Sequence, residues 1–114
     1  MDVDTNAFLK PLIGEYLSGV YFVMDYVQLD FSGQTLTVYN PLTVTADRAL
    51  WSRADSGWRE ALCARIGRHV VTGTCSDNEI NIEFEDGAAF SVSLRDEAYI
   101  GPEAFNFASP GAST

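Results

Sequence analysis

The chain has 114 residues, of which 16 are acidic and seven basic, with a net charge of −9 and a hydrophobic fraction of 46%. This length suits one domain with one core, and no apolar run approaches the roughly 18 residues of a membrane span. Binding to nucleic acid depends on lysine and arginine, so the charge argues against that partner. The first residues, MDVDTNAF, are acidic where a signal peptide needs a basic region, so we expect a cytoplasmic protein with no membrane contact.

The first segment predicts only a short or broken helix. In NAFLKPLIG, residues 6–14, Pro11 interrupts the pattern because proline lacks the backbone N–H that a helix requires. The next segment, YLSGVYFVMD, residues 16–25, predicts a strand that is apolar on both faces from Gly19 onward. Such a strand needs cover on both sides. A structural homodimer is therefore one possible role for the protein.

A hairpin is predicted next. Apolar and polar residues alternate from Val27 to Phe31 and again from Leu36 to Val38. This period of two is typical of antiparallel strands with one face in water. The glycine of Ser32-Gly33, between the two runs, favours a tight turn.

The stretch PLTVTADRALWSRADSGW, residues 41–58, interrupts the pattern, and we expect part of it to be an exposed loop. It carries Trp51 between Arg48 and Arg53. Tryptophan and arginine together are enriched at protein interfaces. Trp51 is therefore a candidate contact residue.

A helix is predicted in SGWREALCARIG, residues 56–67. Trp58, Leu62 and Ile66 recur at i, i+4 and i+8, which is one face of a helix. Asp55 or Ser56 is a plausible N-cap. Gly67 is a plausible C-cap, because glycine readily adopts the left-handed conformation that ends many helices.

Residues 69–94 repeat the strand and hairpin. HVVTGTCS predicts a strand, and alternation follows from Ile80 to Phe84 and from Phe90 to Leu94. Asp86-Gly87 between these runs favours a type I′ turn, in which both central residues have positive φ. The tail GPEAFNFASPGAST loses the alternation, and we expect residues 109–114 to be disordered.

Residues 7–45 and 56–95 thus follow one plan, a helix and a three-stranded meander. Ile13-Gly14 aligns with Ile66-Gly67 at an offset of 53 residues, and one extra residue in the second turn raises the offset to 54. We predict a single α+β domain over residues 1–108, because neither half is expected to close a core alone. Its halves would be related by a pseudo-two-fold axis. They would form a roughly six-stranded, mainly antiparallel sheet or flattened barrel with the clear helix packed on it.

No residue pattern predicts catalysis or a cofactor. His69 is the only histidine and belongs to no nucleophile motif, so a structural role is expected. Cys63 and Cys75, one on a helix and one on a strand, lack metal-ligand spacing and are expected to pack as small buried hydrophobes. No glycine-rich phosphate loop occurs. We expect neither a metal nor another cofactor.

The candidate site is a set of carboxylates. Glu79, Glu83 and Glu85 lie on the polar face of their predicted strand. One interpretation is a recognition surface for a basic protein partner, because like charges on one strand cost stability unless something offsets them. The alternatives are a solvated face, pairing with the five arginines of residues 48–68, or two carboxylates acting as general acid and base. The predicted partner-binding residues are five acids and one tryptophan: Glu79, Glu83, Glu85, Asp86, Asp30 and Trp51.

Four motifs carry a resemblance: LCARIGRHV from Leu62, FEDG from Phe84, FSVSL from Phe90 and GPEAF from Gly101. With them, residues 58–105 resemble a family of small bacterial domains of unknown function. By size and acidic charge the chain is also similar to the immunity proteins of bacterial toxin systems. The resemblance implies a helix followed by a meander and assigns a role to no residue.

These observations favour a non-enzymatic bacterial binding protein. Most concretely, we expect an immunity-type inhibitor that holds a basic protein partner on its acidic strand face. One alternative is a small-molecule-binding domain with a pocket between helix and sheet. The structural homodimer is the other.

Overall fold

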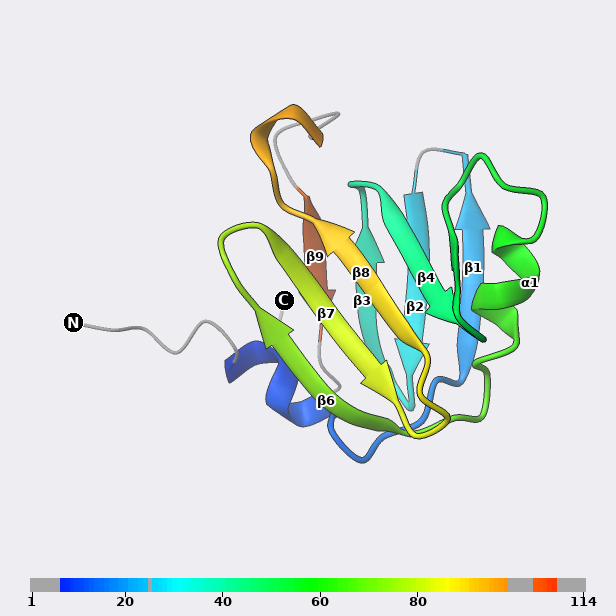
Figure 1. Cartoon of the computed structure of the whole chain (residues 1–114). Coiled ribbons are helices and arrows are strands. Elements are labelled where there is room, and N and C mark those ends of the chain that lie inside the picture. Colours follow the sequence, from blue (N-terminus) through cyan, green and yellow to red (C-terminus); the bar gives the residue numbers. More distant parts are fainter. Residues whose placement is uncertain (1–6, 25, 99–103, 109–114) are drawn as a thin grey trace.

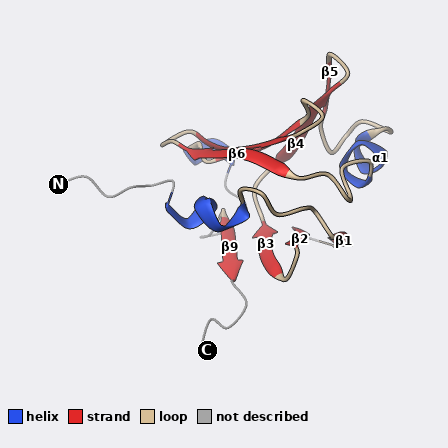
Figure 2. Ribbon diagram, turned by 90° about the horizontal axis from the view of Figure 1, so that it is seen from below, coloured by secondary structure: helices blue, strands red, loops and turns tan. Residues whose placement is uncertain are grey.

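The computed structural model describes residues 7–24, 26–98 and 104–108 (Figure 1). These residues contain nine strands, one α-helix and two short 3-10 helices. Viewed from below, the strands form two layers, with a helical segment at each open side (Figure 2). The α+β class predicted from the sequence is confirmed. Residues 109–114, for which disorder is predicted, lie outside the described residues.

The strands form two antiparallel sheets. The four-stranded sheet has, in spatial order, β1 (Gly19–Val23), β2 (Tyr26–Phe31), β3 (Gln34–Val38) and β9 (Phe105–Ala108). The five-stranded sheet has β5 (Ala49–Trp51), β4 (Leu42–Ala46), β8 (Ala89–Ser93), β7 (Glu79–Phe84) and β6 (Val70–Cys75). The helical elements are η1 (Ala7–Leu12), α1 (Trp58–Cys63) and η2 (Asp96–Ala98).

The core lies between the two layers. Every second residue of β2 and β7 is buried, as the alternation predicts. Phe31 of β2 stacks on Phe84 of β7 with ring centroids 6.5 Å apart, and Phe90 of β8 meets Phe84 edge-on at 4.8 Å. All three rings are fully buried. Burial of a side chain of this size contributes about 1.5–3 kcal/mol, so this aromatic cluster is a main link between the sheets.

The helix α1 covers the open side next to β1 and β4. Trp58 and Leu62 face the core, as their spacing predicts. The indole Nε1 of Trp58 donates a hydrogen bond to the carbonyl of Leu42 at 2.9 Å, and its ring packs edge-on against Phe22. Within the described ranges, no helix has the length and apolar composition needed to cross a membrane.

The helix is shorter than predicted and its N-cap differs. It ends at Cys63, so Ile66 is 44% exposed. The N-cap is Gly57, without a side-chain hydrogen bond, whereas Asp55 or Ser56 was predicted. The Asp55 carboxylate instead accepts a hydrogen bond from the backbone N–H of Ser52 at 2.8 Å. The carboxylate therefore stabilises the turn before the helix rather than the helix itself.

The opposite open side is covered by η1, which packs against β6. Leu9 and Leu12 are fully buried although Pro11 lies between them. Leu9 lies directly over Gly73 of β6, because a Cβ on that glycine would be 3.2 Å from the Cβ of Leu9. A glycine in this strand thus lets the helix approach the sheet closely.

The predicted six strands in one sheet or a flattened barrel are wrong. The structure has nine strands in two sheets, and neither sheet closes on itself. The unpredicted strands are β4 and β5, in the segment expected to be partly loop, and β9 in the tail. β5 has three residues and β9 has four, which is too short for a periodic pattern to be read.

Only the first of the two hairpin turns has the type I′ conformation, which the sequence favours in both and more strongly in the second. Ser32 and Gly33 have φ of 53° and 100°, the two positive values that a type I′ turn needs. At the second turn only Gly87 is positive, at 88°, and its N–H donates to the carbonyl of Phe84 at 3.0 Å. This is a three-residue loop with a glycine bulge rather than the predicted type I′ turn. The second hairpin has one residue more in its turn than the first, and this residue makes the loop three residues long instead of two.

The two meanders share one register at the predicted offset. In β1 and β2, Gly19 lies opposite Asp30. In β6 and β7, Thr72 lies opposite Glu83, and each of these residues is 53 positions after its counterpart. The other pairs that both ladders contain follow the same relation.

The segments that lead into the meanders are joined by reciprocal hydrogen bonds. The N–H of Gly14 donates to the carbonyl of Val70 at 2.8 Å. The N–H of Gly67 donates to the carbonyl of Leu17 at 2.7 Å, and both members of this pair are again related by 53 positions. Gly14 and Gly67 also share a positive φ, of 90° and 93°.

The strand that follows each meander joins the opposite sheet. β4 follows β3 in the chain but pairs with β8 of the five-stranded sheet. β9 follows β8, through η2, but pairs with β3 of the four-stranded sheet. Each half of the chain therefore completes the sheet of the other half.

Candidate functional site

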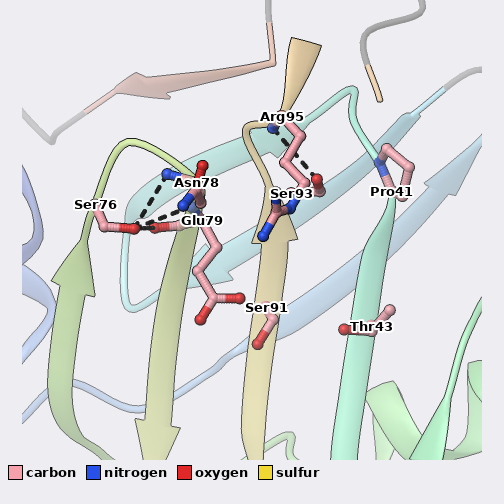
Figure 3. Close-up of a pocket in the computed structure, with 8 residues that line it drawn as sticks. All are labelled: Pro41, Thr43, Ser76, Asn78, Glu79, Ser91, Ser93 and Arg95. Carbon is pink, nitrogen blue, oxygen red and sulfur yellow. Dashed lines mark hydrogen bonds between the residues drawn. The ribbon is translucent and has the colours of Figure 1, made fainter. Parts of the chain in front are cut away.

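A hollow of about 360 Å³ lies on the outer face of the five-stranded sheet (Figure 3). β4, β7 and β8 form its floor, and we call it the outer-face hollow. Its lining includes hydroxyl groups, one carboxylate and one guanidinium, contributed by Thr43, Ser91, Ser93, Glu79 and Arg95.

Strand alternation and register bring these side chains together. Val92 of β8 is buried, so its neighbours Ser91 and Ser93 point outward. Across the ladders, Ser91 lies opposite Thr43 of β4, and Ser93 lies opposite Glu79 of β7. Hydroxyl groups of β4 and β8 thus lie beside the end of β7 where Glu79 is located.

Glu79 is held by the turn that precedes β7. The hydroxyl of Ser76 accepts hydrogen bonds from the N–H groups of Asn78 and Glu79, both at 3.2 Å. The N–H of Ser76 donates to the carbonyl of Glu79 at 2.9 Å. The carboxylate extends over the sheet toward Ser91 (Figure 3) and forms no ion pair within the described part of the chain. The backbone is therefore fixed while the charge stays available.

Arg95 lies at the other side of the hollow, two residues beyond β8. Its N–H donates to the hydroxyl of Ser93 at 3.4 Å, and its side chain lies beside Ser93 (Figure 3). A second hollow of about 300 Å³ next to it is lined by Asp77, Asp96 and Glu97. One guanidinium thus stands among four carboxylates when Glu79 is included. This end of the sheet has a surplus of negative charge.

Of the other predicted acids, only Glu83 shares the outer face with Glu79. It lies four residues further along β7, and it accepts a hydrogen bond from the hydroxyl of Thr72 at 3.1 Å. Glu83 is exposed and has no ion pair among the described residues. The negative face predicted from the strand therefore consists of these two residues.

Glu85 and Asp86 lie in the turn at the far end of β7, roughly 20 Å from Glu79 at 3.3 Å per strand residue. Arg65 pairs with the Asp86 carboxylate at 3.1 Å, and Arg68 lies 3.8 Å from it. This is the predicted alternative in which the arginines pair with the acids across the fold. The charge of the Asp86 carboxylate is therefore offset by arginines of the same chain.

Glu85 is bound to the start of β6. Its carboxylate accepts a hydrogen bond from the backbone N–H of His69 at 3.0 Å and lies 3.2 Å from the imidazole Nδ1. These hydrogen bonds, that of the backbone N–H first, lower the pKa of the Glu85 carboxyl, and the charges of His69 and Arg68 act in the same direction. Glu85 thus ties the turn to β6, and its charge is partly offset.

Asp30 and Trp51 lie away from the hollow. Asp30 is on β2 of the other sheet, where its carboxylate accepts a hydrogen bond from the hydroxyl of Thr35 at 2.6 Å. Trp51 is half-buried on β5, and its indole Nε1 is so near Gly57 that a Cβ there would lie 2.8 Å away. The six predicted residues therefore do not form one patch.

The described residues place no nucleophile beside the histidine. The imidazole of His69 contacts Glu85 and the ring of Tyr16, and no described serine or cysteine hydrogen-bonds to it. Within the described ranges, no group of three histidine, cysteine or acidic residues is positioned to hold a metal ion.

Neither cysteine forms a disulfide in the described residues, and they lie on the helix and the strand predicted for them. Cys63 is exposed, which corrects the prediction that it is buried, because α1 ends there. Cys75 is half-buried against the core. Burial, and secondly the charge of Asp77, raise the pKa of the Cys75 thiol. A thiol with a raised pKa is a poor nucleophile near neutral pH.

The hydroxyl residues of the hollow and Arg95 were not predicted as site residues. The sequence did contain a signal for the hydroxyl residues. In SVS, which begins at Ser91, and in TVT, which begins at Thr43, hydroxyl residues flank a valine on both sides, and both valines are buried. The missing information was the register, which places Ser93 opposite Glu79. A strand pattern gives the face of a residue but not its neighbour on the next strand.

No family model, no curated protein and no solved structure matches the chain. The resemblance of residues 58–105 to small bacterial domains therefore stays a prediction. Any function has to be proposed from the geometry and charge of the chain itself.

Proposed function

We propose that this protein is a non-enzymatic binding protein that recognises a cationic segment of a protein partner with the outer-face hollow. The observation that carries this proposal is the Glu79 carboxylate, fixed by its turn and without an ion pair among the described residues, above a floor of hydroxyl groups. A lysine or arginine side chain supplies several hydrogen-bond donors and no acceptor. Such a side chain is therefore complementary to this surface.

The hydroxyl groups add to the match. The hydroxyl of Thr43 donates to no group in the described ranges, and that of Ser93 only accepts a hydrogen bond, from the N–H of Arg95. Both are available to a partner's backbone or side chain. Arg95 limits the hollow on one side, and it offers the partner a binding point for a carbonyl or carboxylate. Charge supplies the attraction, and the hydroxyl groups supply the directional contacts.

The energetic role of the carboxylates is mainly steering. Exposed ion pairs contribute about 0–1 kcal/mol each, so Glu79 and Glu83 alone do not give a tight complex. A field of one sign increases the association rate and excludes partners of like charge. We therefore expect association with the partner to weaken strongly as salt rises.

The most specific form of the proposal is an immunity-type inhibitor that blocks a basic toxin domain. Its support is the small size, the net charge of −9 and a recognition surface built on paired strands rather than on a loop. A pre-ordered surface loses little conformational entropy on binding. These are the properties that an inhibitor needs in order to bind before its target acts.

A tetralysine peptide tests the location of the site. It is titrated into isotope-labelled wild-type protein and two charge reversals, Glu79→Lys and Glu60→Lys, while backbone amide shifts are recorded. Glu60 is an exposed residue of α1, so both variants change the net charge equally. We expect saturable shifts at Glu79, Ser91 and Thr43 in wild type and in Glu60→Lys, and about tenfold weaker binding in Glu79→Lys. Equal binding by both variants would contradict the proposal.

We further propose that the two halves of the chain are pseudo-two-fold repeats that have exchanged their fourth strands. This is supported by the common register of the two meanders and by the reciprocal hydrogen bonds of Gly14 and Gly67. It is also supported by the crossing of β4 and β9 between the sheets. On this proposal, the outer-face hollow belongs to both halves, because β4 comes from the first and β7 and β8 from the second.

The structural homodimer remains the alternative, and one observation favours it. On the outer side of β1, Tyr21 is 54% exposed and Val23 is 39% exposed, and Met24 beyond them is 84% exposed. Their strand was predicted to need cover on both faces. Its inner face is covered by α1 and the core, through Phe22 and Trp58. A second copy of the chain is one occupant that would cover the outer face.

A further inference from the structure

A second cavity, which we call the inner pocket, lies at the end of the sandwich where the chain crosses from β3 to β4. It has a volume of about 140 Å³ and is partly open to solvent. Val27 and Val38 line it from the four-stranded sheet, Leu42 from the five-stranded sheet and Trp58 from α1. Among the described residues, only Pro41 lines both this pocket and the outer-face hollow, so the two have separate walls.

The depth of the inner pocket is apolar and aromatic. Val38, Leu42 and Trp58 are each 3% exposed or less. Tyr26 and Tyr39 add two rings, which pack edge-to-face with centroids 5.6 Å apart. An apolar cavity of roughly 150 Å³ accommodates a benzene molecule, and aromatic walls favour another ring in an edge-on or offset arrangement. The inner pocket therefore has room for about one ring.

The mouth of the inner pocket carries a positive charge. Arg53 also lines the pocket but, unlike the apolar walls, it is exposed. Its Nη2 donates a hydrogen bond to the carbonyl of Met24 at 2.9 Å, which holds the guanidinium against the turn after β1. This hydrogen bond uses one of the several N–H groups of the guanidinium. The other N–H groups are available to a ligand that enters the pocket.

No described carboxylate offsets the charge of Arg53. Asp55, the nearest acid along the described chain, instead accepts hydrogen bonds from the backbone N–H of Ser52 at 2.8 Å and from its hydroxyl at 3.3 Å. Arg53 forms no ion pair within the described ranges, and no described acid lines the pocket. A guanidinium matches the geometry of a carboxylate and hydrogen-bonds to it strongly. The mouth of the pocket is therefore complementary to a carboxylate.

We propose that the inner pocket binds a small aromatic carboxylic acid of about one ring, with the ring inside and the carboxylate on Arg53 at the mouth. Burial of the ring supplies most of the affinity, because an ion pair at an exposed site contributes little. Arg53 supplies the orientation of the ligand and the preference for an anion. This site does not depend on the outer-face hollow, and it adds a small-molecule ligand to a protein proposed to bind a protein partner.

Benzoate and benzamide test the proposal, because they have nearly the same shape but only benzoate is charged. Each is titrated at neutral pH into the labelled full chain while backbone amide shifts are recorded. We expect benzoate to shift the amides of Val38, Leu42 and Trp58 saturably, and to bind about fivefold more tightly than benzamide. The absence of saturable shifts, equal affinity for the two compounds, or shifts centred on Arg95 in the outer-face hollow would each overturn the proposal.

Two arginine variants complete the test. Arg53→Gln removes the guanidinium at the mouth, and we expect it to bind benzoate no more tightly than benzamide. Arg48→Gln makes the same change in net charge at an exposed residue that does not line the pocket, so it should keep the preference for benzoate. Both side chains are exposed, so we expect both variants to fold. A preference for benzoate that Arg53→Gln retains, or that Arg48→Gln loses equally, would also overturn the proposal.

Discussion

Glu85 and Asp86 follow β7, and both are engaged by the segment between α1 and β6. Arg65 pairs with Asp86, and the N–H of His69 donates to Glu85. Glu79, at the other end of the same strand, faces a hollow and has no ion pair in the part of the chain that the structure describes. The acids of one strand thus have two different roles. Those in the turn hold the fold together, and Glu79 remains free to meet a partner.

The hydrogen bonds at Glu85 predict that the stability of the folded protein depends on pH. Its pKa is lowered in the folded protein, from an ordinary value of 4.5. A lowered pKa means that the ionised carboxylate stabilises the fold above the unfolded-state value and that this contribution is lost as pH falls through the folded value. We expect Glu85→Gln to lose less stability than wild type between about pH 5.5 and about pH 3, measured as urea unfolding midpoints.

The control for this measurement is Glu79→Gln. It removes a carboxylate from the same strand whose side chain accepts no hydrogen bond among the described residues. We expect its midpoint to shift with pH as in wild type. If Glu85→Gln is destabilised by acid as much as wild type is, the hydrogen bonds to His69 do not contribute as described.

At the scale of elements, the crossing of β4 and β9 decides how the chain is held together. The predicted meanders β1–β3 and β6–β8 each lie in one sheet, but the first sheet gains β9 from the second half and the other sheet gains β4 and β5 from the first half. The apolar side chains Leu42 and Val44 of β4 are buried in the five-stranded sheet. Neither half therefore contains all the strands of its own sheet.

Separate halves test the proposed strand exchange. We expect residues 1–55 alone and residues 56–114 alone to give poorly dispersed amide spectra, because β4 and β9 lack their partners. Mixed, they should form a 1:1 complex with the spectrum of the intact chain. A second fragment that ends at Ala104 lacks β9 and should bind the first fragment more weakly. A well-dispersed spectrum of either half alone would show that the halves do not depend on the exchanged strands.

Alternation of apolar and polar residues was enough to predict the elements with local partners. β2 with β3 and β7 with β8 are joined by short turns, so their pattern and pairing are read together. The strands β4 and β9 pair with residues far away in the chain, and three or four residues give no pattern in β5 and β9. The periodicity of a sequence does not show which distant strands pair with each other. The strand order was not predicted, for the same reason.

The site was predicted in part, and the reason is again register. Glu79 and Glu83 were correctly placed on the outer face of a strand, because that follows from alternation within β7. The residues beside them depend on cross-strand pairing, which puts Ser93 next to Glu79. The neutralisation of Asp86 by Arg65 depends on how α1 packs, which no local pattern specifies.

At the scale of the whole molecule, positive and negative charge are separated. In the described part of the chain, four arginine side chains contact other parts of the fold, through ion pairs with Asp86, a ring or a carbonyl: Arg53, Arg59, Arg65 and Arg68. The acids at the start of β7 and after β8 face one guanidinium, that of Arg95. The four carboxylates Glu79, Asp77, Asp96 and Glu97 and the one guanidinium give this end of the sheet a local charge of −3, that is −4 + 1. If the proposed function is right, a cationic partner is steered toward that end.

The most direct test of this account is an affinity capture from the cell lysate with wild type, Glu79→Lys and Glu60→Lys as baits, each washed at low and then high salt. The account predicts that wild type and Glu60→Lys retain one stoichiometric basic protein that leaves as salt rises, and that Glu79→Lys does not retain it. A partner held equally by Glu79→Lys, or one that resists high salt, would contradict recognition by the outer-face hollow.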